Sequence, residues 1–140
     1  MLNPISLAFK KAKKENRPAL LTYTVAGDSS KKQSLDILKS ISKSADILEV
    51  GVPHNTPVAD GIQIQNSAYR SIKNGIKMED IFKIVKDFKK TNIKKPVILM
   101  GYYNMIYQYN ENKFLKSCKN SGVDGIIVVD LPWPENKKFW

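Results

Sequence analysis

The chain has 140 residues, 42% of them hydrophobic, and a formal net charge of +10, a composition that fits one folded domain and excludes a disordered chain. Its single cysteine and single histidine exclude an internal disulfide and a His/Cys metal centre, and no apolar stretch reaches membrane-spanning length, so we expect a soluble, cytoplasmic protein. The lysines are spread over predicted helix faces and only Arg17 and Arg70 are arginines, so the positive charge does not indicate a nucleic-acid partner.

Hydrophobic periodicity predicts helices and strands that alternate along the chain. Helical spacing is clearest from Met78 to Phe88, and Asn3 and Asn110 are predicted helix caps. In chain order, the predicted elements are a helix from Pro4 to the Arg17-Pro18 pair, a strand over 19–25, a helix with its apolar stripe over 35–45, a strand within 45–53, helices over 64–72 and 78–88, a strand over 96–101, a helix between Asn110 and Gly122, a strand over 125–129 and a last helix after Pro134.

Strands that alternate with helices predict βαβ units and a parallel sheet. Two architectures fit this order: an open doubly wound sheet and part of a (β/α)8 barrel. The sequence AGDS at 26–29 does not supply the glycine-rich fingerprint that should follow the first strand of a dinucleotide-binding sheet. The carboxyl ends of the predicted strands, where a barrel builds its active site, carry the unusual residues Tyr23, Asp28, Glu49, Tyr102, Asn104 and Asp130.

Two carboxylates are the candidate catalytic residues. Glu49 lies inside the apolar run ADILEVGVP at 45–53, and strand alternation should place it on the face opposite Leu48 and Val50. Loss of water there raises the pKa of a carboxyl group, which suits one that gives and takes a proton near neutral pH. A structural Glu, paired with a lysine or capped by backbone amides, is the alternative. Asp60 follows in VADG at 58–61, although Asp-Gly is also a common turn pair.

Four blocks of sequence carry a more specific signal. They are YTVAGD at 23–28, LEVGVP at 48–53 continued by PVADG at 57–61 and IQN at 64–66, the segment 96–104 that ends in YYN, and the segment 122–132 that runs from GVDG to DLP. In order and spacing these blocks resemble the tryptophan synthase alpha subunit family. The resemblance covers essentially the whole chain, and the joint arrangement is more specific than any one motif.

The resemblance implies a (β/α)8 barrel lyase of tryptophan biosynthesis that cleaves indole-3-glycerol phosphate into indole and glyceraldehyde 3-phosphate. Glu49 would be the mobile acid/base carboxylate that protonates the indole ring carbon, and Asp60 would hold the indole N–H. No metal or cofactor is implied for this cleavage. The implied partner is a beta subunit, in an alpha2-beta2 type complex, whose pyridoxal phosphate serves the joining of indole to serine.

The same resemblance places further residues. Three match positions that wall the indole pocket, although plain barrel-core packing would also explain them: Tyr23, Met100 and Tyr102. Three others are expected at the interface with the beta subunit: Pro57, Asn104 and Pro132.

The chain departs from the family pattern in the loop after the second strand. The family usually has PFSDP there, whereas residues 53–57 read PHNTP, and Ile62 replaces a later proline. Thr56 takes the place of an acidic residue that normally contacts the beta subunit, which puts that contact in doubt. Tyr23 replaces a usual Phe and adds a hydroxyl to the pocket wall. His54 could be a loop contact or simply exposed.

Length is the largest departure, because a complete barrel needs about 250 residues and eight strands. The sequence predicts only about the first four βα units, so we expect residues 1–140 to be the N-terminal half of a single (β/α)8 barrel domain. Such a fragment should turn over little substrate alone, since the phosphate site of these barrels usually follows strands seven and eight.

Three functions therefore remain open. The first is the alpha-subunit lyase. The second is a non-catalytic half barrel that self-associates or docks on a beta subunit. The third is a different phosphosugar lyase or isomerase on the same barrel, which the combined Glu49 and Asp60 blocks disfavour.

Overall fold

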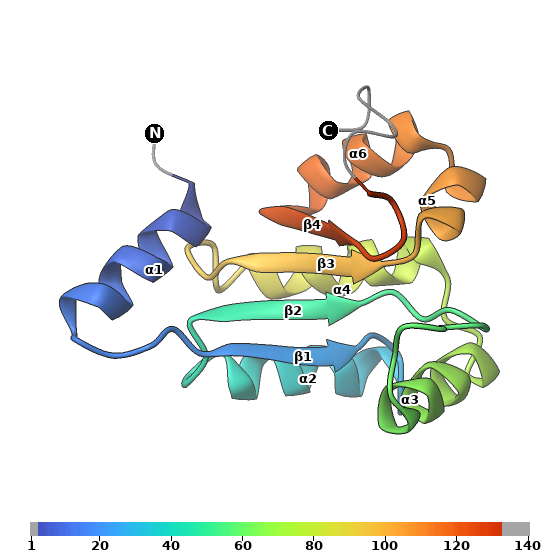
Figure 1. The fold of residues 1–140 in the computed structure, drawn as a ribbon, viewed down its shortest axis with the longest axis horizontal. Coiled ribbons are helices and arrows are strands. Elements are labelled where there is room, and N and C mark those ends of the chain that lie inside the picture. The colour runs from blue at the N-terminus through green and yellow to red at the C-terminus, as the bar shows by residue number, and fades with distance from the viewer. Residues whose placement is uncertain (1–2, 133–140) are drawn as a thin grey trace.

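Short runs of branched and aromatic residues form one parallel sheet. The computed structural model describes residues 3–132, and its four strands lie in the order β1-β2-β3-β4. Because all neighbouring pairs are parallel, the carboxyl ends of the strands meet at one edge (Figure 1). The strands are β1 (Leu21–Val25), β2 (Ile47–Gly51), β3 (Val97–Gly101) and β4 (Gly125–Val128).

Helices connect the strands, and polar side chains cap the amino ends of α1, α2 and α6. The Asn3 side chain accepts from the Ile5 N–H at 2.9 Å, and the Ser30 hydroxyl accepts from the Gln33 N–H at 3.1 Å. Gly122 closes α6 in the left-handed conformation at φ 84°, which favours glycine. The helices are α1 (Pro4–Lys14), α2 (Lys31–Ile41), α3 (Ile62–Lys73), α4 (Met78–Lys89), α5 (Tyr103–Tyr109) and α6 (Glu111–Ser121).

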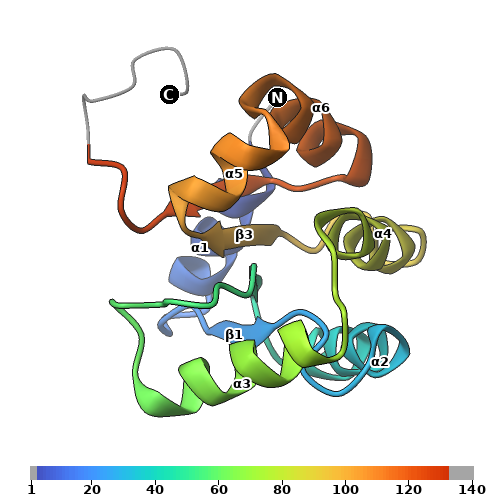
Figure 2. The same cartoon turned by 90° about the vertical axis from the view of Figure 1, so that its right-hand side faces the viewer.

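One face of the sheet packs against α2, α4 and α6 and holds the hydrophobic core (Figure 2). Leu48 and Val50 of β2 lie beside Val97 and Leu99 of β3 in the parallel register, and all four are buried. The core continues into the helices, where Phe88 of α4 is completely buried. Burial of these branched and aromatic side chains is the main favourable contribution to folding.

The opposite face is open over most of its area in the part of the chain that the structure describes. Helix α1 covers its amino end, where the space above Gly125 is filled by the Ile5 side chain and Ile47 is completely buried. Beyond α1, the side chains of Leu21 and Ile127 keep 41% and 40% of their exposure. Figures 1 and 2 show α2 and α4 on one side of the strands only.

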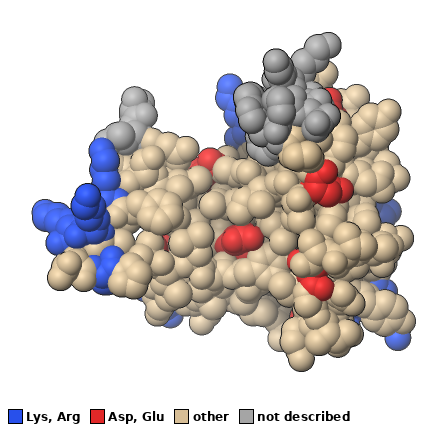
Figure 3. Space-filling view, viewed as in Figure 1, with Lys and Arg blue, Asp and Glu red and all other residues tan. Residues whose placement is uncertain are grey.

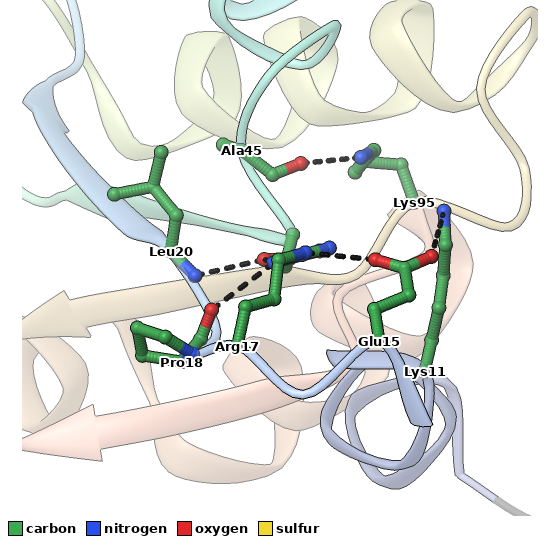
Figure 4. Close-up of polar contacts among 8 residues, drawn as sticks. Lys11, Glu15, Arg17, Pro18, Leu20, Ala45 and Lys95 are labelled. Carbon is green, nitrogen blue, oxygen red and sulfur yellow. Dashed lines mark hydrogen bonds and ion pairs between the residues drawn. The ribbon is translucent and has the colours of Figure 1, made fainter. Parts of the chain in front are cut away.

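An ion-pair network ties the α1–β1 connection to the start of β2 (Figure 4). The Arg17 guanidinium donates to both Asp46 carboxylate oxygens, at 2.6 and 2.8 Å, and the Leu20 N–H donates to the same carboxylate at 2.8 Å. Nearby, the Lys95 ammonium donates to the Ala45 carbonyl. The hydrogen bonds from Arg17 hold the pKa of Asp46 well below its usual range.

The predicted α/β fold class is confirmed by four parallel strands that are separated by helices. One helix was not predicted: α5, whose sequence YNMIYQY has no clean amphipathic repeat and is rich in aromatic residues of modest helix propensity. The helix predicted after Pro134 lies outside the described residues. Across residues 3–132, no helix is both long and apolar enough to cross a membrane.

Phe88→Ala should lower the free energy of unfolding by about 3–5 kcal/mol, because it leaves a cavity in the closed side of the sheet. Ile93→Ala, at a side chain that is 77% exposed, should change it by less than about 0.5 kcal/mol. Urea unfolding followed by circular dichroism measures both, and equal effects would contradict the location of the core.

Asp46→Asn should reduce the pH dependence of stability. The folded-state pKa of Asp46 is depressed, so its carboxylate stabilises the fold above the ordinary aspartate pKa of about 4, and this contribution is lost as pH falls. Urea midpoints of the unmodified chain should therefore drop more between neutral and acidic pH than those of the variant. Parallel curves would show that the Arg17–Asp46 pair does not act in this way.

Candidate active site

Glu49 occupies the middle of the open face of the sheet. Leu48 and Val50 point into the core, so alternation along β2 places Glu49 on the other side. There it lies between Tyr23 of β1 and Ile98 of β3 in the parallel register, and it is half-buried. The sheet thus removes part of the water around a carboxyl group in an otherwise apolar setting.

The Glu49 carboxyl group gains no compensating partner within residues 3–132, where none of the hydrogen bonds and ion pairs includes it. The alternative of a Glu paired with a lysine or capped by backbone amides is therefore not what this part of the chain shows. Burial raises the pKa of Glu49 above its ordinary value. This side chain can consequently carry a proton closer to neutral pH than an exposed Glu can.

Tyr23 lies next to Glu49 and crosses toward the end of β2. Its ring covers Gly51, where an added Cβ would lie 2.2 Å from the Tyr23 Oη, so only glycine leaves room for the ring. Burial raises the pKa of Tyr23, and the negative charges of Asp60 and Glu49 raise it further. Both carboxylates therefore act on the same hydroxyl group, which places the three side chains in one electrostatic environment.

Asp60 is held in the loop after β2 by Tyr102. The Tyr102 hydroxyl donates to Asp60 Oδ2 at 3.2 Å and accepts from the Ala59 N–H at 3.0 Å. Tyr102 directly follows β3 and is only 4% exposed, so the loop is fastened to a rigid point. Burial raises the pKa of Tyr102, which keeps the hydroxyl protonated and able to donate.

His54 is a loop contact rather than a free surface residue. Its ring stacks on Tyr102 with a centroid distance of 4.9 Å, and its Nδ1 accepts from the Thr56 N–H at 3.0 Å. The histidine thus shapes the loop that carries Asp60 and supports the ring that binds Asp60.

The remaining residues predicted for the pocket and the interface also lie at or near the carboxyl edge. Met100 pairs with Gly51 in the register and is half-buried. Asn104 is exposed on α5 and lines a cavity of about 310 Å³ together with the 52–55 segment. Pro57 is half-buried and Pro132 exposed. Figure 3 shows acidic side chains near the centre and the carboxyl edge of this face, whereas lysine and arginine gather over α1.

The loops at this edge are joined to one another. The Tyr103 N–H donates to Asp130 Oδ1 at 2.7 Å, so the start of α5 is tied to the segment after β4. Tyr102, one residue earlier, binds the loop after β2. The described residues contain no group of three or more His, Cys, Asp or Glu side chains that could hold a metal ion.

The sequence pattern did not predict the polar cluster that joins the β1–α2 turn to α3. Asp28 accepts from Arg70 Nε at 2.6 Å and from the Ser67 hydroxyl at 2.7 Å. A signal was present, because Ser67, Arg70, Ser71 and Asn74 recur at helical spacing. It was overlooked because polar stripes normally mark a solvated face.

Four parallel strands in sequence order, separated by helices, with one carboxylate on β2 and another in the loop after it, are typical of part of a (β/α)8 barrel. A family model described as tryptophan synthase alpha chain matches residues 9–140. The chain therefore belongs to the tryptophan synthase alpha chain family, as the sequence resemblance predicts.

Similar proteins agree with this assignment. The tryptophan synthase alpha chain of Pelagibacter ubique (strain HTCC1062) is 73% identical over 135 residues, which are 96% of this chain and 51% of that protein. A tryptophan synthase subunit alpha structure from Legionella pneumophila str. Paris superposes with a TM-score of 0.94 at 35% identity, over 99% of this chain and 53% of that one.

A structure of the tryptophan synthase a2b2 complex from Pyrococcus furiosus matches at 45% identity with a TM-score of 0.83, over 86% of this chain and 51% of that chain. This chain thus spans about half the length of the curated relatives it matches.

Glu49→Gln should stabilise the chain at pH 7 to 8. Because burial raises the pKa of Glu49, its ionised form opposes folding, and a neutral amide removes that cost. The gain should shrink below pH 4, where the carboxyl is neutral in both states. Glu79→Gln is a control of opposite sign, since hydrogen bonds, the largest from its own backbone, lower the pKa of Glu79. Urea unfolding midpoints of the variants measure both effects. A loss of stability in Glu49→Gln at pH 8 would contradict the partly buried, unfavourable environment of the Glu49 carboxylate.

Proposed function

We propose that this chain carries the acid/base machinery of an indole-3-glycerol phosphate lyase and supplies four βα units of one eight-unit barrel domain. The observation that supports it most is the half-buried Glu49, which has no hydrogen-bond or ion-pair partner among residues 3–132 and lies in the same electrostatic environment as Asp60. The family assignment supports the same reaction. In this proposal Glu49 and Asp60 are catalytic, and Tyr23, Met100 and Tyr102 surround the indole ring.

The reaction needs one group that first gives and then takes a proton. The protonated Glu49 delivers its proton to the indole ring carbon that bears the glycerol chain, which leaves an iminium cation in the ring. The Glu49 carboxylate then removes the proton from the adjacent glycerol hydroxyl. The carbon–carbon bond breaks, its electron pair restores the aromatic ring, and the hydroxyl carbon leaves as an aldehyde. A raised pKa suits both steps.

Asp60 stabilises the positive charge that protonation creates on the indole ring. Its carboxylate accepts a hydrogen bond from the indole N–H and faces the positive charge of the iminium as it develops. Tyr102 supports this role, because its hydroxyl binds only one carboxylate oxygen, Oδ2. No step requires a metal or a cofactor, since protons alone are exchanged. Pyridoxal phosphate would belong to a beta subunit.

We also propose that the edge formed by Pro57, Asn104 and Pro132 faces a beta subunit. The supporting feature is their common position at this edge, where the loop after β2, the start of α5 and the segment after β4 are joined by the Tyr102 and Tyr103 hydrogen bonds, with a cavity of about 310 Å³ beside Asn104. Thr56 is exposed on the same loop and carries no charge, so the contact would rest on shape and hydrogen bonds there.

The reaction is tested by joining this chain to the C-terminal half of the Pelagibacter ubique relative and measuring indole release from indole-3-glycerol phosphate. The extended protein should be active, and both Glu49→Gln and Asp60→Asn should lower kcat by about 10²-fold or more, the usual scale for losing a proton-transfer group. Glu79→Gln, the same change at an exposed position on α4, should leave kcat unchanged.

A well-folded extended protein that releases no indole would contradict the lyase assignment and favour the non-catalytic binding module. An active protein that tolerates Glu49→Gln would instead overturn the role of Glu49.

A further inference from the structure

Helix α3, which follows Asp60, is weakly anchored by apolar contacts. Within it only Ala68 and Ser71 are buried. The side chains of Ile62 and Tyr69 remain 64% and 68% exposed. The stabilisation from hydrophobic burial scales with the apolar area removed from water. This helix therefore gains little stabilisation from burial and needs another source of attachment.

A polar face supplies that attachment. Ser67, Arg70, Ser71 and Asn74 follow helical spacing and all bind the segment 26–29 that joins β1 to α2. The Ser71 hydroxyl is completely buried and donates to the Ala26 carbonyl at 2.5 Å. The Asn74 amide nitrogen, with its two N–H donors, lies 2.8 to 3.1 Å from three consecutive carbonyl oxygens: those of Gly27, Asp28 and Ser29.

Asp28 is the charged centre of this face. Arg70 donates to both of its carboxylate oxygens, from Nε at 2.6 Å and from Nη2 at 3.0 Å, and Ser67 donates at 2.7 Å. A two-pronged guanidinium–carboxylate contact fixes direction as well as distance. Hydrogen bonding to Arg70 also lowers the pKa of Asp28, so the pair stays charged at neutral pH.

The amino end of α3 sets the backbone of Asp60. Gly61 is the N-cap residue and has no side chain with which to cap the helix. The Gln65 side-chain amide, in the second turn, donates to the Asp60 carbonyl at 2.8 Å. Asp60 is thus attached on one side to α3 and on the other to Tyr102 on the core scaffold. A shift of α3 would move the carboxylate relative to Glu49.

We propose that the Asp28–Arg70 ion pair is a positioning element for Asp60, which acts through α3 and does not touch the substrate. The inference rests on the proposed function only in giving Asp60 its chemical role. The attachment itself is a property of the 140-residue chain and can be measured without activity.

Amide hydrogen exchange tests the attachment. In Asp28→Asn, the Ala59 and Gln65 amides, which bind Tyr102 and Gly61, should exchange at least about tenfold faster, as expected for local opening. The amides of Ile84 and Val85 in α4 should keep their rates. Asp87→Asn is the matched control, because it removes a 2.6 Å ion pair with Lys90 on α4 and should leave Ala59 and Gln65 unchanged.

The proposal is overturned if Asp28→Asn exchanges like the unmodified chain, or if the α4 amides accelerate equally, which would indicate a global loss of stability. It is also overturned if Ala59 shows no protection in the unmodified chain.

Kinetics of the extended protein provide a second readout. Asp28→Asn should lower kcat more than it raises KM, because the Asp60 contact strengthens as charge develops in the transition state. Arg70→Lys, which keeps the positive charge but not the two-point contact of the guanidinium, should lower kcat less than Asp28→Asn does. An effect confined to KM would contradict the proposal. Absence of activity in the unmodified extended protein would count against the lyase, while the exchange result would still decide the positioning role.

Discussion

The alternation of side chains along β2 is the constraint on which both the core and the site depend. Leu48 and Val50 are buried against the helices, and the strand geometry that points them inward also points Glu49 the other way. The carboxyl group cannot regain water by choosing another orientation, because a shift of one residue in register would expose Leu48 and Val50. A stable core therefore enforces an unfavourable environment for Glu49.

The same arrangement divides the molecule into a supporting end and a chemical end. At the amino end, the Arg17–Asp46 pair and Lys95 tie connections together. At the carboxyl edge, Tyr102 joins β3 to the Asp60 loop. The supporting contacts are an ion pair and a lysine–carbonyl hydrogen bond, both of which favour folding, whereas Glu49 has no such partner within residues 3–132. The contacts that favour folding thus lie in the connections at the amino end of the sheet, whereas the proton-transfer group lies in the middle of its open face.

Much of this organisation was predictable from the sequence, because hydrophobic periodicity reports burial directly. The strand containing Glu49, its orientation and the caps at Asn3 and Asn110 follow from local rules. Helix α5 was missed because it is only seven residues long and buries only Ile106, so its sequence has no clear repeat. The attachment of α3 through Asp28 was missed for a related reason: its partners are 39 to 46 residues apart, and a polar stripe has the same pattern whether it faces water or another loop.

The roles of Glu49 and Asp60 are chemical proposals, and the central one concerns the protonation of Glu49. Carbon-13 NMR titration of the Glu49 carboxyl in the 140-residue chain, assigned by comparison with Glu49→Gln, measures it directly. Because the sheet removes water from this group, we expect a pKa above that of an ordinary glutamate, which is about 4.3. A value at or below that reference would show that the carboxyl is solvated or paired and would contradict its assignment as the proton-transfer group.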